Sequence, residues 1–192
     1  MNAWSPLSRF ILDIDAVLAV AVRICEDRAG DRPAQFAARF LKGLDAEMVL
    51  TVGLLADAGD EAMEVIRYFD QSHVDSAIVS QKLRAFEDRI TDLFINGKLL
   101  SVDGHTRVVQ AWLQTAHVYQ VNGEVMSIGG PLALRGVVDT CMKRMCAWAL
   151  LAMEVIHAEF PSFDAMNAMR IFDVITPTSS TPCDGGLGWQ HS

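Results

Sequence analysis

The sequence lacks any apolar run that is long enough to cross a bilayer. The longest uninterrupted run, residues 145–153, has nine residues, whereas a membrane-spanning helix needs about 20. No secretory signal is evident either, because the apolar stretch 10–25 is interrupted by Asp13, Asp15 and Arg23. We therefore expect a soluble protein, and leave an organelle open in case an import sequence has been removed.

Clustered positive charge is also missing. Sixteen Lys and Arg residues stand against 24 Asp and Glu residues, for a net charge of −8. The densest basic group, at residues 82–89, is interleaved with the carboxylates of Glu87, Asp88 and Asp92. Because affinity for a phosphate backbone comes mainly from clustered Lys and Arg, we expect no direct binding to nucleic acid.

Cysteine is scarce and irregularly placed. Cys25, Cys141, Cys146 and Cys183 form no C-x-x-C pair, and residues five apart on a helix, such as Cys141 and Cys146, point away from each other. This pattern predicts reduced, partly buried thiols in a reducing intracellular compartment.

A catalytic motif is absent as well, and the sharpest candidate is Glu154-x-x-His157. In carboxylate-bridged metal bundles such a pair supplies two ligands from one helix, but the site also needs a second pair and two lone carboxylates. The one other pair, Asp70-x-x-His73, falls at the end of a predicted helix. The sequence therefore predicts no enzyme, no cofactor and no metal. On the helix predicted over residues 46–69, four acidic residues indicate a solvent-exposed face: Asp57, Asp60, Glu61 and Glu64.

What the chain does contain is helical periodicity. Residues 46–69 and 73–95 predict two helices joined by a short polar turn, hence an antiparallel hairpin. We expect Leu55, Ile66, Leu83 and Ile90 in their shared core. The full predicted seams are Met48, Val52, Leu55, Ala62, Ile66 and Phe69, and then Val79, Leu83, Phe86, Ile90 and Leu93.

Together the segments predict an all-α fold, a single helical domain over 1–175 of about six or seven helices packed around a long central helix. Phe36 and Phe40 are expected on the inner face of their helix, and a helix is predicted through Trp112 to Tyr119. Residues 145–153 have no polar face, so we place the long helix 132–160, which contains them, at the centre. The other predicted helices span 6–27, 33–43, 106–119 and 162–175, with irregular segments at 98–105 and 122–131.

Beyond these helices, residues 176–192 hold two prolines and three glycines and show no core period. We expect an extended C-terminal tail that is held by a partner or by the domain itself. Leu187 and Trp189 are its expected partner-binding residues, because tryptophan is enriched among interface anchors.

Residues 156–173 resemble a stretch of hAT-type transposase relatives, in which a long helix ends at Phe-Pro and a short helix ends at Phe-Asp. Here these are Phe160-Pro161 and Phe172-Asp173. Residues 48–94 are similar to the same group. The resemblance implies an all-helical insertion from a ribonuclease-H-like domain, detached from its catalytic carboxylates, zinc finger and dimerisation block, so no catalytic residue is carried over.

An apolar share of 51% and a mean hydropathy of +0.23 fit either a well-filled core or a surface that partners cover. The leading hypothesis is a non-enzymatic interaction protein, an accessory or scaffold subunit of a multi-subunit assembly, for which the resemblance implies descent from a transposase fragment. Its partners are other proteins. The alternatives are a helical metal-carboxylate enzyme using Glu154 and His157, and a nuclear DNA-associated transposase-like protein.

Overall fold

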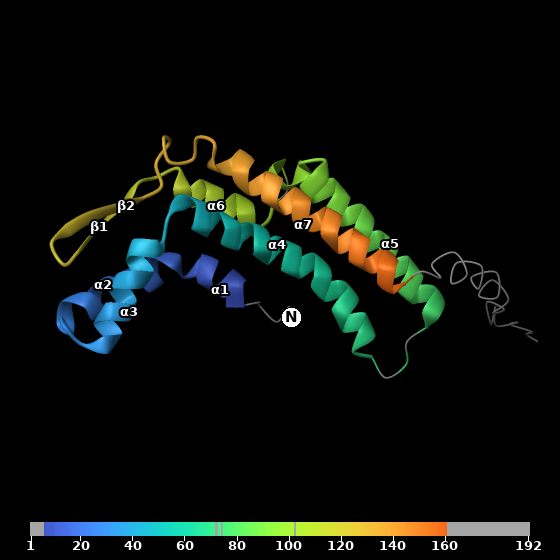
Figure 1. Cartoon of the computed structure of the whole chain (residues 1–192), viewed down its shortest axis with the longest axis horizontal. Coiled ribbons are helices and arrows are strands. Elements are labelled where there is room, and N and C mark those ends of the chain that lie inside the picture. Colours follow the sequence, from blue (N-terminus) through green and yellow to red (C-terminus); the bar gives the residue numbers. More distant parts are fainter. Residues whose placement is uncertain (1–5, 72, 74, 102, 161–192) are drawn as a thin grey trace, which may run out of the picture.

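The computed structural model describes residues 6–71, 73, 75–101 and 103–160 (Figure 1). Helices dominate the described residues and a single two-stranded hairpin interrupts them, so the predicted all-α class is confirmed. The elements are α1 (Pro6–Leu12), α2 (Ile14–Asp27), α3 (Arg32–Gly43), α4 (Ala46–Phe69), α5 (Ser76–Ile90), the π-helical turn η1 (Thr91–Ile95), the 3₁₀ turn η2 (Lys98–Ser101), α6 (His105–Leu113), β1 (His117–Val121), β2 (Glu124–Ile128) and α7 (Val137–Glu159).

Helix α4 is the element around which the others gather. It begins after Asp45, whose carboxylate accepts a hydrogen bond from the backbone N–H of Met48 at 2.7 Å, as a good N-cap does. Along its length it packs against α1, α5, α6 and α7. The predicted bounds of this helix, 46–69, are confirmed.

The hairpin of α4 and α5 is confirmed, but one of its two predicted seams is wrong. Leu83 and Ile90 are buried as expected, whereas Leu55 and Ile66 are 41% and 47% exposed. Helix α4 instead turns the side with Val49, Leu50 and Leu54 to the core. Gly53 lies on this side, where α6 approaches so closely that a Cβ atom on Gly53 would lie only 3.1 Å from Thr106 Cα. The buried side of α4 consists of Ala46, Val49, Leu50, Gly53, Leu54, Ala56, Asp57 and Ala58.

The predicted central position of residues 145–153 is wrong. Met145 and Ala149 are buried, but Leu150 and Leu151 of the same run are more than half exposed. Trp148 is half-buried and packs edge-on against Phe94, with ring centroids 5.8 Å apart. Helix α7 therefore lies on the flank of the bundle with one buried side.

The predicted helix 106–119 ends early, at Leu113. Tyr119, expected on that helix, lies in β1, which pairs with β2 in antiparallel register. Asn122 and Gly123 form the two-residue turn with φ of 52° and 83°, the conformation that Asn-Gly favours between strands. The hairpin returns so closely to α6 that a Cβ atom on Gly129 would lie 2.5 Å from the carbonyl oxygen of Thr115.

Further elements differ in detail from the sequence prediction. The predicted helix 6–27 is divided at Asp13 into α1 and α2, and α7 begins at Val137 rather than at 132. No helix among the described residues has both the length and the apolar character to cross a membrane. The predicted helix 162–175 and the tail 176–192, with Leu187 and Trp189, lie outside the described residues.

Candidate functional site

An apolar groove runs along α2 and α3, and we call it the α2–α3 groove. The two helices pack antiparallel, with the Cys25 thiol of α2 3.7 Å from the carbonyl oxygen of Ala34 on α3. At the other end of α3, the Phe40 ring lies edge-on to Phe10 of the preceding helix α1. The groove has a volume of about 720 Å³. Its lining is apolar except for one carboxylate: Asp13, Ala16, Val17, Val20, Ala21, Ile24, Pro33, Phe36, Ala37 and Phe40.

Phe36 is the most prominent side chain of the α2–α3 groove. It is 57% exposed, as is Val20 on the opposite helix, so its predicted inward orientation is wrong. The Arg32 guanidinium lies 5.6 Å from the centre of the Phe36 ring, a cation–π distance. The groove therefore presents an exposed aromatic ring with a positive charge at its edge, while Asp13 places a negative charge toward the far end.

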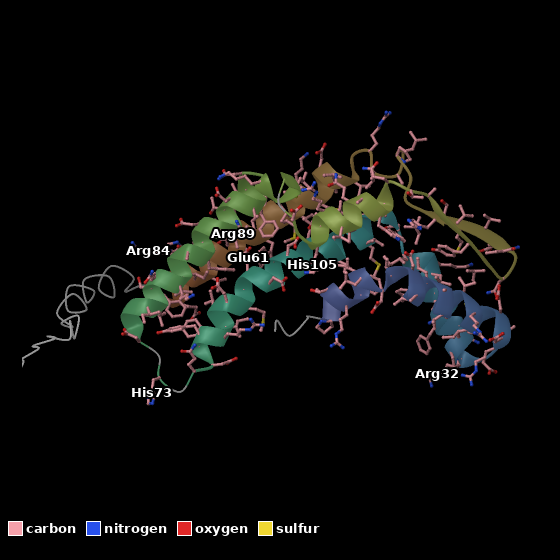
Figure 2. The ribbon with its side chains drawn as sticks, turned by 180° about the vertical axis from the view of Figure 1, so that it is seen from behind. Arg32, Glu61, His73, Arg84, Arg89 and His105 are labelled. Carbon is pink, nitrogen blue, oxygen red and sulfur yellow. The ribbon has the colours of Figure 1, made fainter. Side chains whose placement is uncertain are left out.

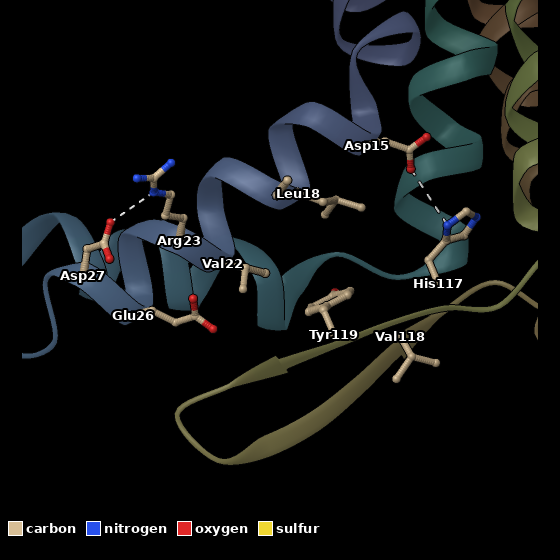
Figure 3. Close-up of a pocket in the computed structure, with 10 residues that line it drawn as sticks. Asp15, Leu18, Val22, Arg23, Glu26, Asp27, His117, Val118 and Tyr119 are labelled. Atoms are coloured by element: carbon tan, nitrogen blue, oxygen red, sulfur yellow. Dashed lines mark hydrogen bonds and ion pairs between the residues drawn. The ribbon is translucent and has the colours of Figure 1, made fainter.

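A second, polar pocket of about 610 Å³ lies between α2 and β1 (Figure 3). The Trp112 indole N–H donates to the Asp15 carboxylate at 2.9 Å, and the His117 ring stacks on Trp112 with centroids 3.7 Å apart. His117 Nε2 lies 3.0 Å from the carbonyl oxygen of Trp112, and since a carbonyl only accepts, that nitrogen carries the proton. These bonds join α2, α6 and the hairpin.

Tyr119 and Arg23, on the walls of the same pocket, also have partners within the protein. The Tyr119 hydroxyl donates to the carbonyl oxygen of Leu41 at 3.2 Å, and burial raises the pKa of this phenol. Arg23 pairs with Asp27 at 3.2 Å. The Tyr119 hydrogen bond thus joins β1 to α3, whereas the Arg23–Asp27 pair lies within α2.

A serine of α1 and an aspartate of α4 meet at His105 of α6, which Figure 2 labels. His105 Nε2 lies 3.1 Å from Ser8 Oγ and 3.1 Å from Asp60 Oδ2. A catalytic triad uses both ring nitrogens, one for the nucleophile and the other for the carboxylate. Here both partners share one nitrogen and Ser8 is buried, so the contacts act as a junction between three helices.

Asp57 lies beside this junction and is buried, which makes its predicted place on a solvated face wrong. Its two carboxylate oxygens accept hydrogen bonds from the backbone N–H groups of His105 and Thr106, at 2.7 and 2.8 Å. Gly104, at the N-cap position of α6, has no side chain with which to cap that helix. A carboxylate from α4 therefore takes the capping role.

The residues proposed for metal chemistry are not joined by further ligands into a metal site in the described part of the chain. Glu154 is exposed, and His157 Nε2 lies 3.1 Å from Glu87 Oε1 on α5, with a geometry that gives an ion pair and no aligned hydrogen bond. Burial raises the pKa of Glu87 and the nearby His157 opposes that shift. His73 is exposed beyond the end of α4. The described part of the chain contains no group of three or more His, Cys, Asp or Glu residues placed to hold a metal ion.

No known protein family, curated protein or solved structure matches this chain.

Proposed function

We propose that this chain is a non-enzymatic interaction protein, an accessory or scaffold subunit that receives an apolar helix of a partner protein in the α2–α3 groove. The observation that carries the proposal is the exposure of Phe36 and Val20 on the two walls of one apolar hollow. Exposed apolar patches of monomers tend to be small, and larger ones mark binding surfaces. Helix-in-groove docking is a common way to fill such a hollow.

The chemistry of the groove indicates what the partner helix presents. Phe36 offers the kind of aromatic anchor that dominates binding energy, so we expect Leu, Ile, Met or Phe against it, spaced three and four residues apart. Arg32 at the Phe36 ring and Asp13 at the opposite end favour a helix with an acidic side chain near the former and a basic one near the latter. The proposed contacts of Leu187 and Trp189 would add a second point of attachment.

Two further observations support a structural role for the polar clusters. The Ser8–His105–Asp60 junction and the Asp15–Trp112–His117 contacts both join separate elements. Each has its hydrogen bonds directed to other parts of the fold, as expected for groups that fix a scaffold.

The test is isolation of the tagged full chain from its native source, followed by quantitative mass spectrometry and light scattering. We expect a partner in stoichiometric amount with the wild type, and its loss with Phe36→Asp. The matched control is Val125→Asp, because Val125 is 73% exposed on β2 and is not among the residues that line the α2–α3 groove. A wild-type chain that isolates alone as a monomer, or a partner retained by a folded Phe36→Asp variant, would overturn the proposal.

The alternatives have their own tests. Stoichiometric iron, manganese or zinc in protein purified without added metal would favour the metal-carboxylate enzyme using Glu154 and His157. A salt-dependent shift of DNA would favour the DNA-associated protein. The kinship with hAT-type transposases stays a prediction, since most of its more specific stretch, 161–173, lies outside the described residues.

A further inference from the structure

A second apolar surface lies along α4 and α7, away from the α2–α3 groove. Leu55, Ile66 and Phe69 of α4 are exposed, and so are Leu151 and Val155 of α7. We call these five residues the α4–α7 face. Figure 1 shows α7, α4 and α1 side by side in that order, with α5 beyond α7.

The two helices run parallel, which aligns their exposed residues. At the start of α7, Cys141 Sγ is 3.6 Å from Thr51 Oγ1, and at its end the Phe160 ring stacks on Phe69 with centroids 6.2 Å apart. The residues between these two contacts therefore lie at matching positions along the two helix axes.

The exposed residues also share one flank of the helix pair. Arg144 pairs with Glu47 of α4, so its row on α7 faces α4. Leu151 and Val155 follow Arg144 by seven and eleven positions, which on a helix is the same row. Leu55 and Ile66 are likewise eleven residues apart on α4. The apolar side chains thus form one strip across the two helices.

The position of the chain exit identifies what covers this strip. The described chain leaves α7 at Phe160, which already lies against Phe69 at one end of the face. Residues 162–175 follow, and nine of these fourteen residues are apolar. As a helix they would be about 21 Å long, the same length as α4 from Leu55 to Phe69 at about 1.5 Å per residue.

We propose that residues 162–175 fold back antiparallel to α4 and cover the α4–α7 face. Pro161 ends the preceding helix and Ser162 offers an N-cap, so a short turn suffices for reversal, as in other helical hairpins. Covalent attachment places the segment at an effective concentration in the millimolar range. A second copy of the chain lacks this advantage, which favours the chain's own segment as the occupant. The inference concerns a surface separate from the α2–α3 groove and does not depend on the proposed function.

The experiment uses the full chain with a photoreactive benzophenone side chain in place of Phe172. After irradiation, peptide mapping of the monomer band should place the cross-link on α4 or α7, between Leu55 and Ile66 or near Leu151. A benzophenone at position 36 is the control, because Phe36 lies on the α2–α3 groove and should not reach these peptides. A covalent dimer as the main product would assign the face to a second copy and overturn the proposal.

A second variant tests the face itself. Ile66→Asp should abolish the internal cross-link while leaving the far-UV circular dichroism unchanged, since Ile66 is 47% exposed in the described fold. Val125→Asp should leave the cross-link intact. Cross-links that persist in Ile66→Asp, that map only to α1, α2 or α3, or that do not form in the monomer each refute the assignment. Phe36→Asp tests the proposed function and should not alter the cross-link, so the two proposals fail separately.

Discussion

Replacement of Asp57 by alanine should be among the most damaging single changes in this fold. The carboxylate is 8% exposed and caps α6 from another helix through the N–H groups of His105 and Thr106. Hydrogen bonds to a charged acceptor contribute about 1.5–3 kcal/mol each. Loss of an N-cap costs about 0.5–2 kcal/mol, but this figure already includes the hydrogen bonds to the capped N–H groups, so the two estimates are not added in full. We therefore expect Asp57→Ala to lower the free energy of unfolding by about 3–4 kcal/mol.

Urea unfolding followed by far-UV circular dichroism at pH 7 measures this loss. Asp57→Asn should fall between the wild type and Asp57→Ala, because the amide keeps one acceptor oxygen but turns a donor toward the other N–H. Asp60→Asn is the matched control one turn away. The Asp60 side chain is 57% exposed in its contact with His105, and exposed pairs contribute about 0–1 kcal/mol. A cost below about 1 kcal/mol for Asp57→Ala would refute the capping role.

The capping contact of Asp57 can also be disturbed by a substitution at Gly104. A Cβ atom on Gly104 would lie 2.7 Å from Asp57 Oδ1, so Gly104→Ala should displace the carboxylate. If the clash is the cause, Gly104→Ala will cost less in an Asp57→Ala background than in the wild type. Additive effects would show that the two residues act independently.

Three further predictions follow from local geometry. Gly53→Ala should destabilise by about 1–3 kcal/mol because its Cβ would crowd α6, whereas Gly59→Ala, with open space around it, should stabilise by about 0.5–1 kcal/mol in the same urea assay. Burial raises the pKa of Glu87, so the folded protein binds that proton more tightly and stability falls as pH rises above the ordinary value of 4.5. Glu87→Gln should therefore raise the melting temperature at pH 7 more than at pH 4, and an equal effect at both would contradict the cause. Cys141 is buried with its pKa raised by burial, so peptide mapping after alkylation of native protein should find Cys146 modified long before Cys141.

Helix positions could be predicted from the sequence because their signals are local. The apolar period predicted the bounds of α4, which the structure shows to begin after the Asp45 cap. It also predicted the buried stripe of α5 correctly at Leu83 and Ile90. The predicted stripe of α4 lies on the wrong side, because the side with Val49, Leu50 and Leu54 is apolar as well and periodicity alone does not choose between two apolar sides. Gly53 and Ala56 mark the true core side, since small residues let another helix approach closely.

At the β-hairpin, the sequence carries two conflicting signals, a helical spacing of apolar residues and a turn between two strands. Trp112, Leu113 and Tyr119 fit a helical spacing, and this hid the strand β1 that contains Tyr119. Asn122-Gly123 is the strongest short signal for a two-residue hairpin turn, and it was assigned only to an irregular segment. The turn residues should have outweighed the helical spacing, because both adopt positive φ, which a helix does not allow.

The candidate sites depend on contacts that are distant in sequence. Asp57 and the N–H groups that it caps are 48 and 49 residues apart, so no spacing rule identifies the bond. The α2–α3 groove depends on which sides of α2 and α3 face each other, and the sequence placed Phe36 on the inner side. Both errors have one origin, because helical periodicity defines a stripe but does not name the neighbour that the stripe meets.

The two apolar surfaces arise in different ways, and this decides what each is expected to bind. The α2–α3 groove is a hollow between two helices, with Phe36 on one wall, and a hollow fits a ridge on another protein. The α4–α7 face is a strip along two parallel helices that begins where the chain leaves α7 at Phe160, so the nearest apolar segment belongs to the chain itself. Burying a single Leu or Ile side chain contributes about 1.5–3 kcal/mol. We therefore propose the chain's own segment for the strip and a partner helix for the groove.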